Sequence, residues 1–100
     1  MTDPLTAVQV QIYGRVQGVW FRAWTATTAS DLGLAGWVRN RSDGSVEALF
    51  VGAATEIEAM IEKCRQGPPA ARVDDIVRET RANEPLNEIR AAGFRKLPTP

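Results

Sequence analysis

The sequence predicts an α+β fold in which two helices cover one face of an antiparallel sheet. Several segments alternate apolar and polar residues, which indicates half-buried strands, and two others repeat apolar residues at helical spacing. These segments follow one another in the order β-α-β-β-α-β. One hundred residues, 44% of them hydrophobic and 24% charged, suit one domain, residues 1–100, with a core over about residues 7–97.

The first half of the chain contributes a strand, a loop, a helix and a second strand. Aliphatic and polar residues alternate over residues 8–13, which predicts the first strand. Two glycines punctuate the following loop. A helical face then runs from Phe21 to Leu32 and ends at Gly33. Residues 34–40 read as the second strand.

The second half begins with a hairpin and a clear helix. A turn signal at residues 41–44 joins the second strand to a third over residues 45–51. A helix is predicted over residues 55–66, with Thr55 and Glu58 as a capping box and a Gly-Pro-Pro stop behind it.

The last third of the chain is less regular. Residues 72–81 predict a fourth strand, although Asp74 and Asp75 break its alternation. Residues 83–93 read as a polar connection, and residues 94–97 could add a short edge strand. The segment 83–100 is therefore the hardest to place. The element order as a whole is the split βαβ, or ferredoxin-like, arrangement.

Composition excludes several classes of function. Twelve basic residues balance twelve acidic ones, so no net charge attracts nucleic acid or a membrane surface. No apolar run is long enough to span a bilayer, and the single Cys64, on the apolar stripe of the second helix, predicts an inert buried thiol and a cytoplasmic protein. With no histidine and one cysteine, neither a metal nor another cofactor is expected.

The loop between the first strand and first helix predicts a phosphate site. A glycine-containing turn that opens a helix can direct backbone N–H groups and the helix N-terminus at one anion. Arg22, in the first turn of the helix, adds a planar fork that matches two phosphate oxygens. The loop residues expected to bind through their backbone are Arg15, Val16, Gln17, Gly18 and Val19.

Two motifs resemble the signatures of the acylphosphatase family. Residues 14–22, GRVQGVWFR, are similar to the first signature, and residues 36–40, GWVRN, followed by GSVE at 44–47 and by Gly52, are similar to the second. The resemblance extends from about residue 8 to residue 77. It implies that Arg22 binds the substrate phosphate and that Asn40 positions the attacking water.

The resemblance further implies hydrolysis of a small-molecule acyl phosphate to a carboxylate and inorganic phosphate, which would also compete with the substrate. The chemistry suits a chain without histidine, because a carboxylate leaves without a general acid. Phosphoryl transfer relies mainly on positioning and charge stabilisation, and the water can give its proton to a phosphate oxygen. Nothing in the sequence demands more than a monomer.

Two alternatives remain open at the level of sequence. An RNA-recognition-like module shares the fold, but its longer aromatic motif is absent here, and the net charge is zero. A catalytically silent acylphosphatase-like domain is the second alternative, although both Arg22 and Asn40 are present. Trp20 is expected near the substrate entrance, and Trp37 either in the core or at the rim of the site.

Overall fold

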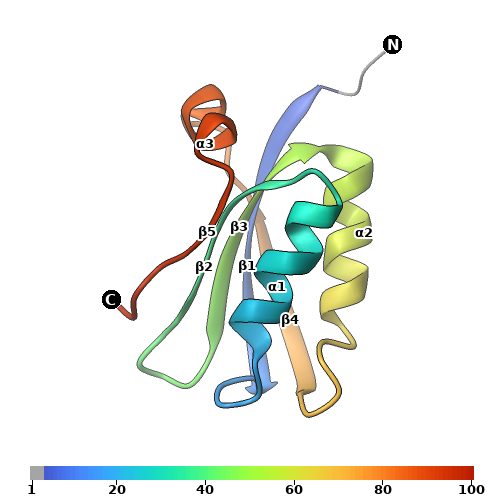
Figure 1. The fold of residues 1–100 in the computed structure, drawn as a ribbon, viewed down its shortest axis with the longest axis vertical. Coiled ribbons are helices and arrows are strands. Elements are labelled where there is room, and N and C mark those ends of the chain that lie inside the picture. The colour runs from blue at the N-terminus through green and yellow to red at the C-terminus, as the bar shows by residue number, and fades with distance from the viewer. Residues whose placement is uncertain (1–3) are drawn as a thin grey trace.

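The computed structural model describes residues 4–100 and confirms the predicted β-α-β-β-α-β order, to which it adds one helix and one strand (Figure 1). The strands are β1 (Leu5–Arg15), β2 (Ala35–Asn40), β3 (Val46–Ala53), β4 (Arg72–Thr80) and β5 (Phe94–Lys96). The helices are α1 (Phe21–Asp31), α2 (Ala54–Cys64) and α3 (Leu86–Ala92).

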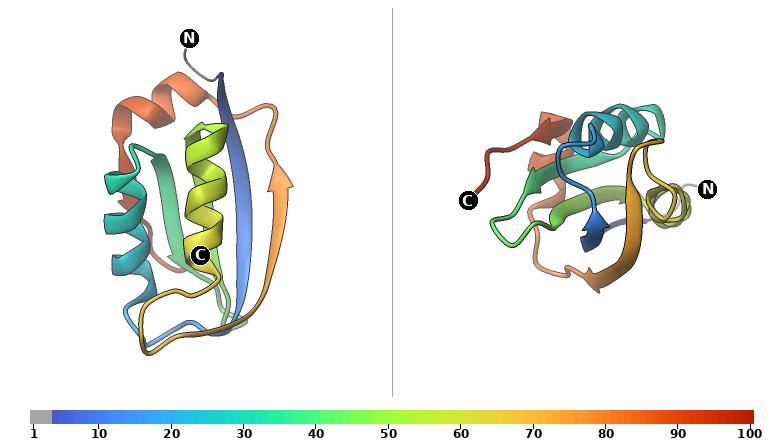
Figure 2. Two further views of the ribbon diagram at one scale, coloured as in Figure 1. Left: turned by 90° about the vertical axis from the view of Figure 1, so that its right-hand side faces the viewer. Right: turned by 90° about the horizontal axis from the view of Figure 1, so that it is seen from below.

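The sheet has the strand order β4-β1-β3-β2-β5. Neighbouring strands among the first four are antiparallel, whereas β5 runs parallel to β2 and forms one edge. Helices α1 and α2 lie side by side over one face of this sheet (Figure 2). The expected ferredoxin-like arrangement, with two helices on one face of the sheet, is thus confirmed. The first four strands are antiparallel as expected, whereas β5, the possible edge strand of residues 94–97, makes the sheet mixed.

The main core fills the space between these two helices and the sheet. Phe50 of β3 lies at its centre, fully buried, and the Phe94 ring stacks on it at 5.9 Å between ring centroids. Cys64 belongs to this core, as its place on the apolar stripe predicts. Burial raises the pKa of its thiol to about 12, so the thiol stays protonated and unreactive at neutral pH.

The opposite face carries a smaller core under α3. Leu86 and Ile89 pack there against Leu49, and Trp37 joins them, turned away from the helices α1 and α2. The expectation of a polar connection over residues 83–93 is therefore wrong, because most of it is helical. The sequence signal was two apolar residues three apart in a seven-residue helix, which is too short a pattern to establish a period.

The predicted capping box is also wrong. Helix α2 starts one residue earlier than expected, with Ala53 as a N-cap that makes no side-chain hydrogen bond, so Thr55 lies inside the first turn. Glu58 instead accepts a 2.9 Å hydrogen bond from Nη1 of Arg78 on β4. This pairing lowers the pKa of the Glu58 carboxyl and connects the helix to the sheet.

A β-bulge explains the irregular pattern of β4. Tyr13 pairs with Asp75 and Gly14 with Val73, so Asp74 is an extra residue that has no pairing partner on β1. Gly14 has a φ of 132°, and a Cβ there would lie 2.1 Å from the carbonyl oxygen of Arg72. Only glycine fits this close approach. The bulge lies just before the end of β1 at Arg15, where the loop of residues 16–20 begins.

Candidate active site

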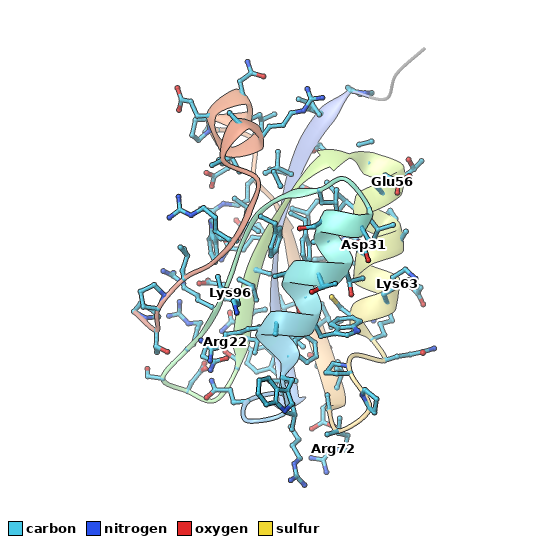
Figure 3. All side chains as sticks on the ribbon, in the orientation of Figure 1. Arg22, Asp31, Glu56, Lys63, Arg72 and Lys96 are labelled. Atoms are coloured by element: carbon cyan, nitrogen blue, oxygen red, sulfur yellow. The ribbon has the colours of Figure 1, made fainter. Side chains whose placement is uncertain are left out.

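A pocket of about 570 Å³ opens where α1 begins and where β2 and β5 end. Three separate parts of the chain build it: the loop before α1 with the first turn of that helix, the end of β2, and the C-terminal segment. Figure 3 shows the Arg22 and Lys96 side chains in this region, between α1 and β5. The lining residues are Val16, Gly18, Trp20, Phe21, Arg22, Ala23, Asn40, Lys96, Leu97 and Pro98.

The N-terminus of α1 faces this pocket without a side-chain cap. Trp20 is the N-cap and adopts a left-handed conformation, with φ 67° and ψ 20°, and its side chain is 82% exposed, as expected near an entrance. The first turn contains no acidic residue. Its N–H groups have no partners within the helix, and the positive end of the helix dipole lies at the same place. This end of α1 therefore suits an anion.

The loop of residues 16–19 offers further donors. Within the described residues 4–100, none of its backbone N–H groups donates a hydrogen bond to another backbone group. Val16 and Gly18 line the pocket, and the Val16 side chain, like that of Val19, is also buried in the main core. Arg15 is the exposed last residue of β1, opposite Arg72. Of the five predicted loop residues, the pocket lining thus includes two.

Gln17 fixes the loop to the hairpin that carries Asn40. Its Nε2 donates hydrogen bonds of 2.8 Å to the carbonyl oxygen of Arg41 and 2.9 Å to that of Ser45. The sequence predicts a backbone role for this residue, but its side chain has a structural role that the motif alone does not reveal. The two sides of the pocket are consequently held at a fixed separation.

Asn40 is the last residue of β2, and it alone of its neighbours faces the pocket. Arg39 and Arg41 turn to the other face of the sheet, where both donate to Oε1 of Glu47, at 2.7 and 3.1 Å. Asn40 pairs with the core residue Val46 and so projects toward the helices. Its buried Oδ1 accepts no hydrogen bond from the described residues. An unmet acceptor costs about 1–3 kcal/mol, so this amide is prepared for a polar partner.

The hairpin turn beyond Asn40 is held by its own side chains. Oδ1 of Asp43 accepts hydrogen bonds of 2.6 Å from the hydroxyl and 2.9 Å from the backbone N–H of Ser45. These bonds lower the pKa of Asp43, so the carboxylate form that makes them persists into mild acid. The predicted turn at residues 41–44 is confirmed, and its rigidity supports the position of Asn40.

Two cations face the pocket without acidic neighbours. Within residues 4–100, neither Arg22 nor Lys96 forms an ion pair, and no carboxylate lines the cavity. Sequence reasoning missed Lys96, because the face of the sheet on which this side chain lies depends on the pairing of β5 with β2, which the sequence pattern does not predict. The described residues also place no three His, Cys, Asp or Glu side chains together. The pocket therefore offers two cations and no carboxylate to a small anion.

Comparison with known proteins agrees with this chemistry. The family model named Acylphosphatase matches residues 8–95. An acylphosphatase of Bradyrhizobium diazoefficiens is 54% identical, with 92% of this chain and 94% of that protein covered. One of Rhizorhabdus wittichii is 52% identical, covering 93% and 89%. The structure of an acylphosphatase from Coxiella burnetii superposes with a TM-score of 0.84 at 34% identity, covering 93% of each chain.

These matches favour the hydrolase interpretation over the RNA-recognition alternative, because they extend through both motifs and most of the fold. The family match over residues 8–95 also includes α3, the helix that departs from the sequence-based expectation. Among the described residues, no helix combines the length and apolar character needed to cross a membrane.

Proposed function

The chain belongs to the acylphosphatase family and hydrolyses acyl phosphates, and from this premise we propose which of its groups carry out the reaction. Arg22, the start of α1 and the backbone of Arg15, Val16, Gln17, Gly18 and Val19 hold the phosphate group, while Asn40 positions the attacking water. The observation that carries this assignment is that Arg22, Asn40 and the uncapped start of α1 all line the same pocket.

Phosphate binding rests on three kinds of donor. The Arg22 guanidinium binds two phosphate oxygens in a bidentate manner, and the N–H groups of loop residues 16–19 bind the others. The α1 terminus adds its partial positive charge. Because the loop, anchored by Gln17, and the helix end hold their N–H groups in place before the substrate arrives, these donors stabilise the charge that spreads over the phosphoryl oxygens in the transition state.

The chemical step needs little further help from the protein. The amide of Asn40, whose Oδ1 accepts no hydrogen bond from the described residues, takes one from the water and aims its oxygen at phosphorus. A new P–O bond forms while the bond to the acyl oxygen breaks, and the carboxylate departs with the electron pair. The water passes one proton to a phosphate oxygen, so no protein base is required.

Three further proposals concern inhibition, oligomeric state and compartment. Inorganic phosphate, the product, competes with the substrate because it fills the same site. The enzyme acts as a monomer in the cytoplasm: α3 covers part of the second sheet face, and polar Gln9 and Gln11 of β1 occupy the same face. The buried thiol of Cys64 is compatible with a reducing compartment.

The test measures benzoyl phosphate hydrolysis by the wild type, Arg22→Ala and Asn40→Ala, with inorganic phosphate as inhibitor. We expect Arg22→Ala to lower kcat/KM about 100- to 1,000-fold and to abolish inhibition by phosphate, because it removes the main binding group. Asn40→Ala is expected to lower kcat about 100-fold while the inhibition constant for phosphate stays within about twofold, because it affects the transition state alone.

Arg65→Ala is the matched control. Arg65 is an exposed arginine at the end of α2, paired with Glu62 at 3.3 Å and outside the pocket lining, so its removal should change none of these constants. Turnover by Arg22→Ala at the wild-type rate would refute the assignment of Arg22 to the phosphate site. An equal loss of phosphate binding and turnover in Asn40→Ala would assign that residue to binding instead.

A further inference from the structure

Lys96 projects into the pocket because of its register on β5. The parallel pairing places Lys96 beside Val38 of β2, a fully buried residue of the main core, and Phe94 beside Gly36. Paired residues point to the same face of a sheet, and Phe94 already stacks on Phe50 under the helices. Lys96, two residues further, therefore lies on the helix-covered face. Figure 3 shows it near Arg22.

No acidic residue offsets the charge of Lys96 in this pocket. The ammonium group shares one cavity with the Arg22 guanidinium and the positive end of α1, and no carboxylate lines that cavity. Within the described chain, Lys96 has no ion-pair partner. An anion that enters the cavity therefore meets two cations. The arrangement thus points to more negative charge in the substrate than one phosphate site needs.

Lys96 belongs to the part of the pocket wall that the C-terminal segment builds. Lys96, Leu97 and Pro98 line this part, whereas Val16, Gly18 and the first turn of α1 line another. Asn40, at the end of β2, completes the lining. An acyl phosphate whose phosphate group is held by the loop and Arg22 therefore extends its acyl half along Lys96, Leu97 and Pro98.

We propose that Lys96 binds a second anionic group, a carboxylate or a phosphate, on the acyl half of the substrate. The enzyme then prefers acyl phosphates whose acyl group carries a negative charge. Leu97 and Pro98 contact the intervening carbon chain, and the backbone N–H of Leu97, bonded to the carbonyl oxygen of Val38 at 2.9 Å, fixes this wall. The inference rests on the proposed function and names the substrate class for the same site.

A matched pair of substrates tests it. Succinyl phosphate and butanoyl phosphate have acyl chains of equal length and differ in the terminal carboxylate. We expect the wild type to show a kcat/KM for succinyl phosphate about tenfold higher than for butanoyl phosphate. Lys96→Gln should reduce this ratio to about one, and Lys96→Arg should restore most of it, because a cation of similar reach returns.

Arg95→Gln is the control variant. Arg95 precedes Lys96 on β5 but pairs with Trp37 on the other face of the sheet, so its loss should leave the substrate ratio unchanged. Rising ionic strength provides an independent readout. At about 1 M salt the preference should shrink in the wild type, because screening weakens the attraction between the exposed Lys96 and the acyl charge.

Three outcomes would overturn the inference. A wild-type ratio near one, or a ratio that survives in Lys96→Gln, excludes recognition of the acyl charge by Lys96. An equal fall of both substrates in Lys96→Gln, with weaker inhibition by inorganic phosphate, assigns Lys96 to the phosphate itself. Each result leaves the proposed function separately testable, because butanoyl phosphate hydrolysis by the wild type and its loss in Arg22→Ala do not depend on the acyl charge.

Discussion

Trp20 shows how a single strained residue can prepare a binding site. It is the one residue other than glycine with a positive φ among those that the structure describes, and it stands directly before α1. Left-handed geometry costs an ordinary side chain about 1–2 kcal/mol. In return, the chain turns abruptly into α1, and the first N–H groups of this helix face the pocket that Arg22 also lines.

Trp20→Gly should therefore stabilise the protein. Glycine adopts positive φ without a steric penalty, and the indole is 82% exposed, so little buried area is lost. We expect the free energy of unfolding, measured by urea denaturation, to rise by about 1 kcal/mol. Trp20→Ala, which removes the indole but retains the strain, serves as the control and should not be stabilised. A gain of equal size in both variants would locate the cost in the exposed ring instead.

At the scale of elements, the site depends on how a loop and a hairpin are joined. Asn40 ends β2 and the phosphate loop leaves β1, two strands that are separated by β3 in the sheet. The side chain of Gln17 bridges them through two carbonyl oxygens of the hairpin turn. Without this bridge, the loop N–H groups and the Asn40 amide would move independently, although each local structure could persist.

Gln17→Ala should weaken phosphate binding without removing any group that touches phosphate through its side chain. We expect the inhibition constant for inorganic phosphate to rise about tenfold, together with KM for benzoyl phosphate, because the loop must be ordered on binding. Gln11→Ala is the control, since Nε2 of Gln11 contacts Oγ of Ser45 on the same turn at 3.2 Å but lies on β1, outside the loop. Equal effects in both variants would indicate general loosening of the turn.

The same scale separates what the sequence could predict from what it could not. Strands β1 to β4 and helices α1 and α2 follow from alternation, helical spacing and turn residues, which are local properties. The two motifs likewise placed Arg22 beside the helix start and Asn40 at a strand end, and the structure brings both into one pocket. Helix α3 escaped prediction because seven residues give hardly two turns of pattern. The direction of Lys96 required the pairing of β5 with β2, a contact between residues far apart in sequence.

Across the whole molecule, a neutral chain carries a locally positive pocket. Acidic and basic residues are equal in number, yet the cavity lining contains Arg22 and Lys96 and no carboxylate. Other arginines are neutralised elsewhere, for example Arg39 by the buried Glu47 and Arg78 by Glu58. The protein thus avoids a general attraction for polyanions while it concentrates positive potential at one small site.

The composition of the whole chain also determines how the rate depends on pH. The chain has no histidine, the side chain that ordinarily titrates between about pH 5 and 8. The resolved shifts move other groups away from that interval: hydrogen bonds lower the pKa values of Asp43 and Glu58, and burial raises that of Cys64 to about 12. Because the mechanism uses no protein acid or base, kcat for benzoyl phosphate should stay constant within about twofold from pH 6 to 8, in the presence of a chelator. A bell-shaped kcat profile with a limb inside this interval would mean that a protein group transfers the proton, and the direct transfer from water to phosphate would have to be abandoned.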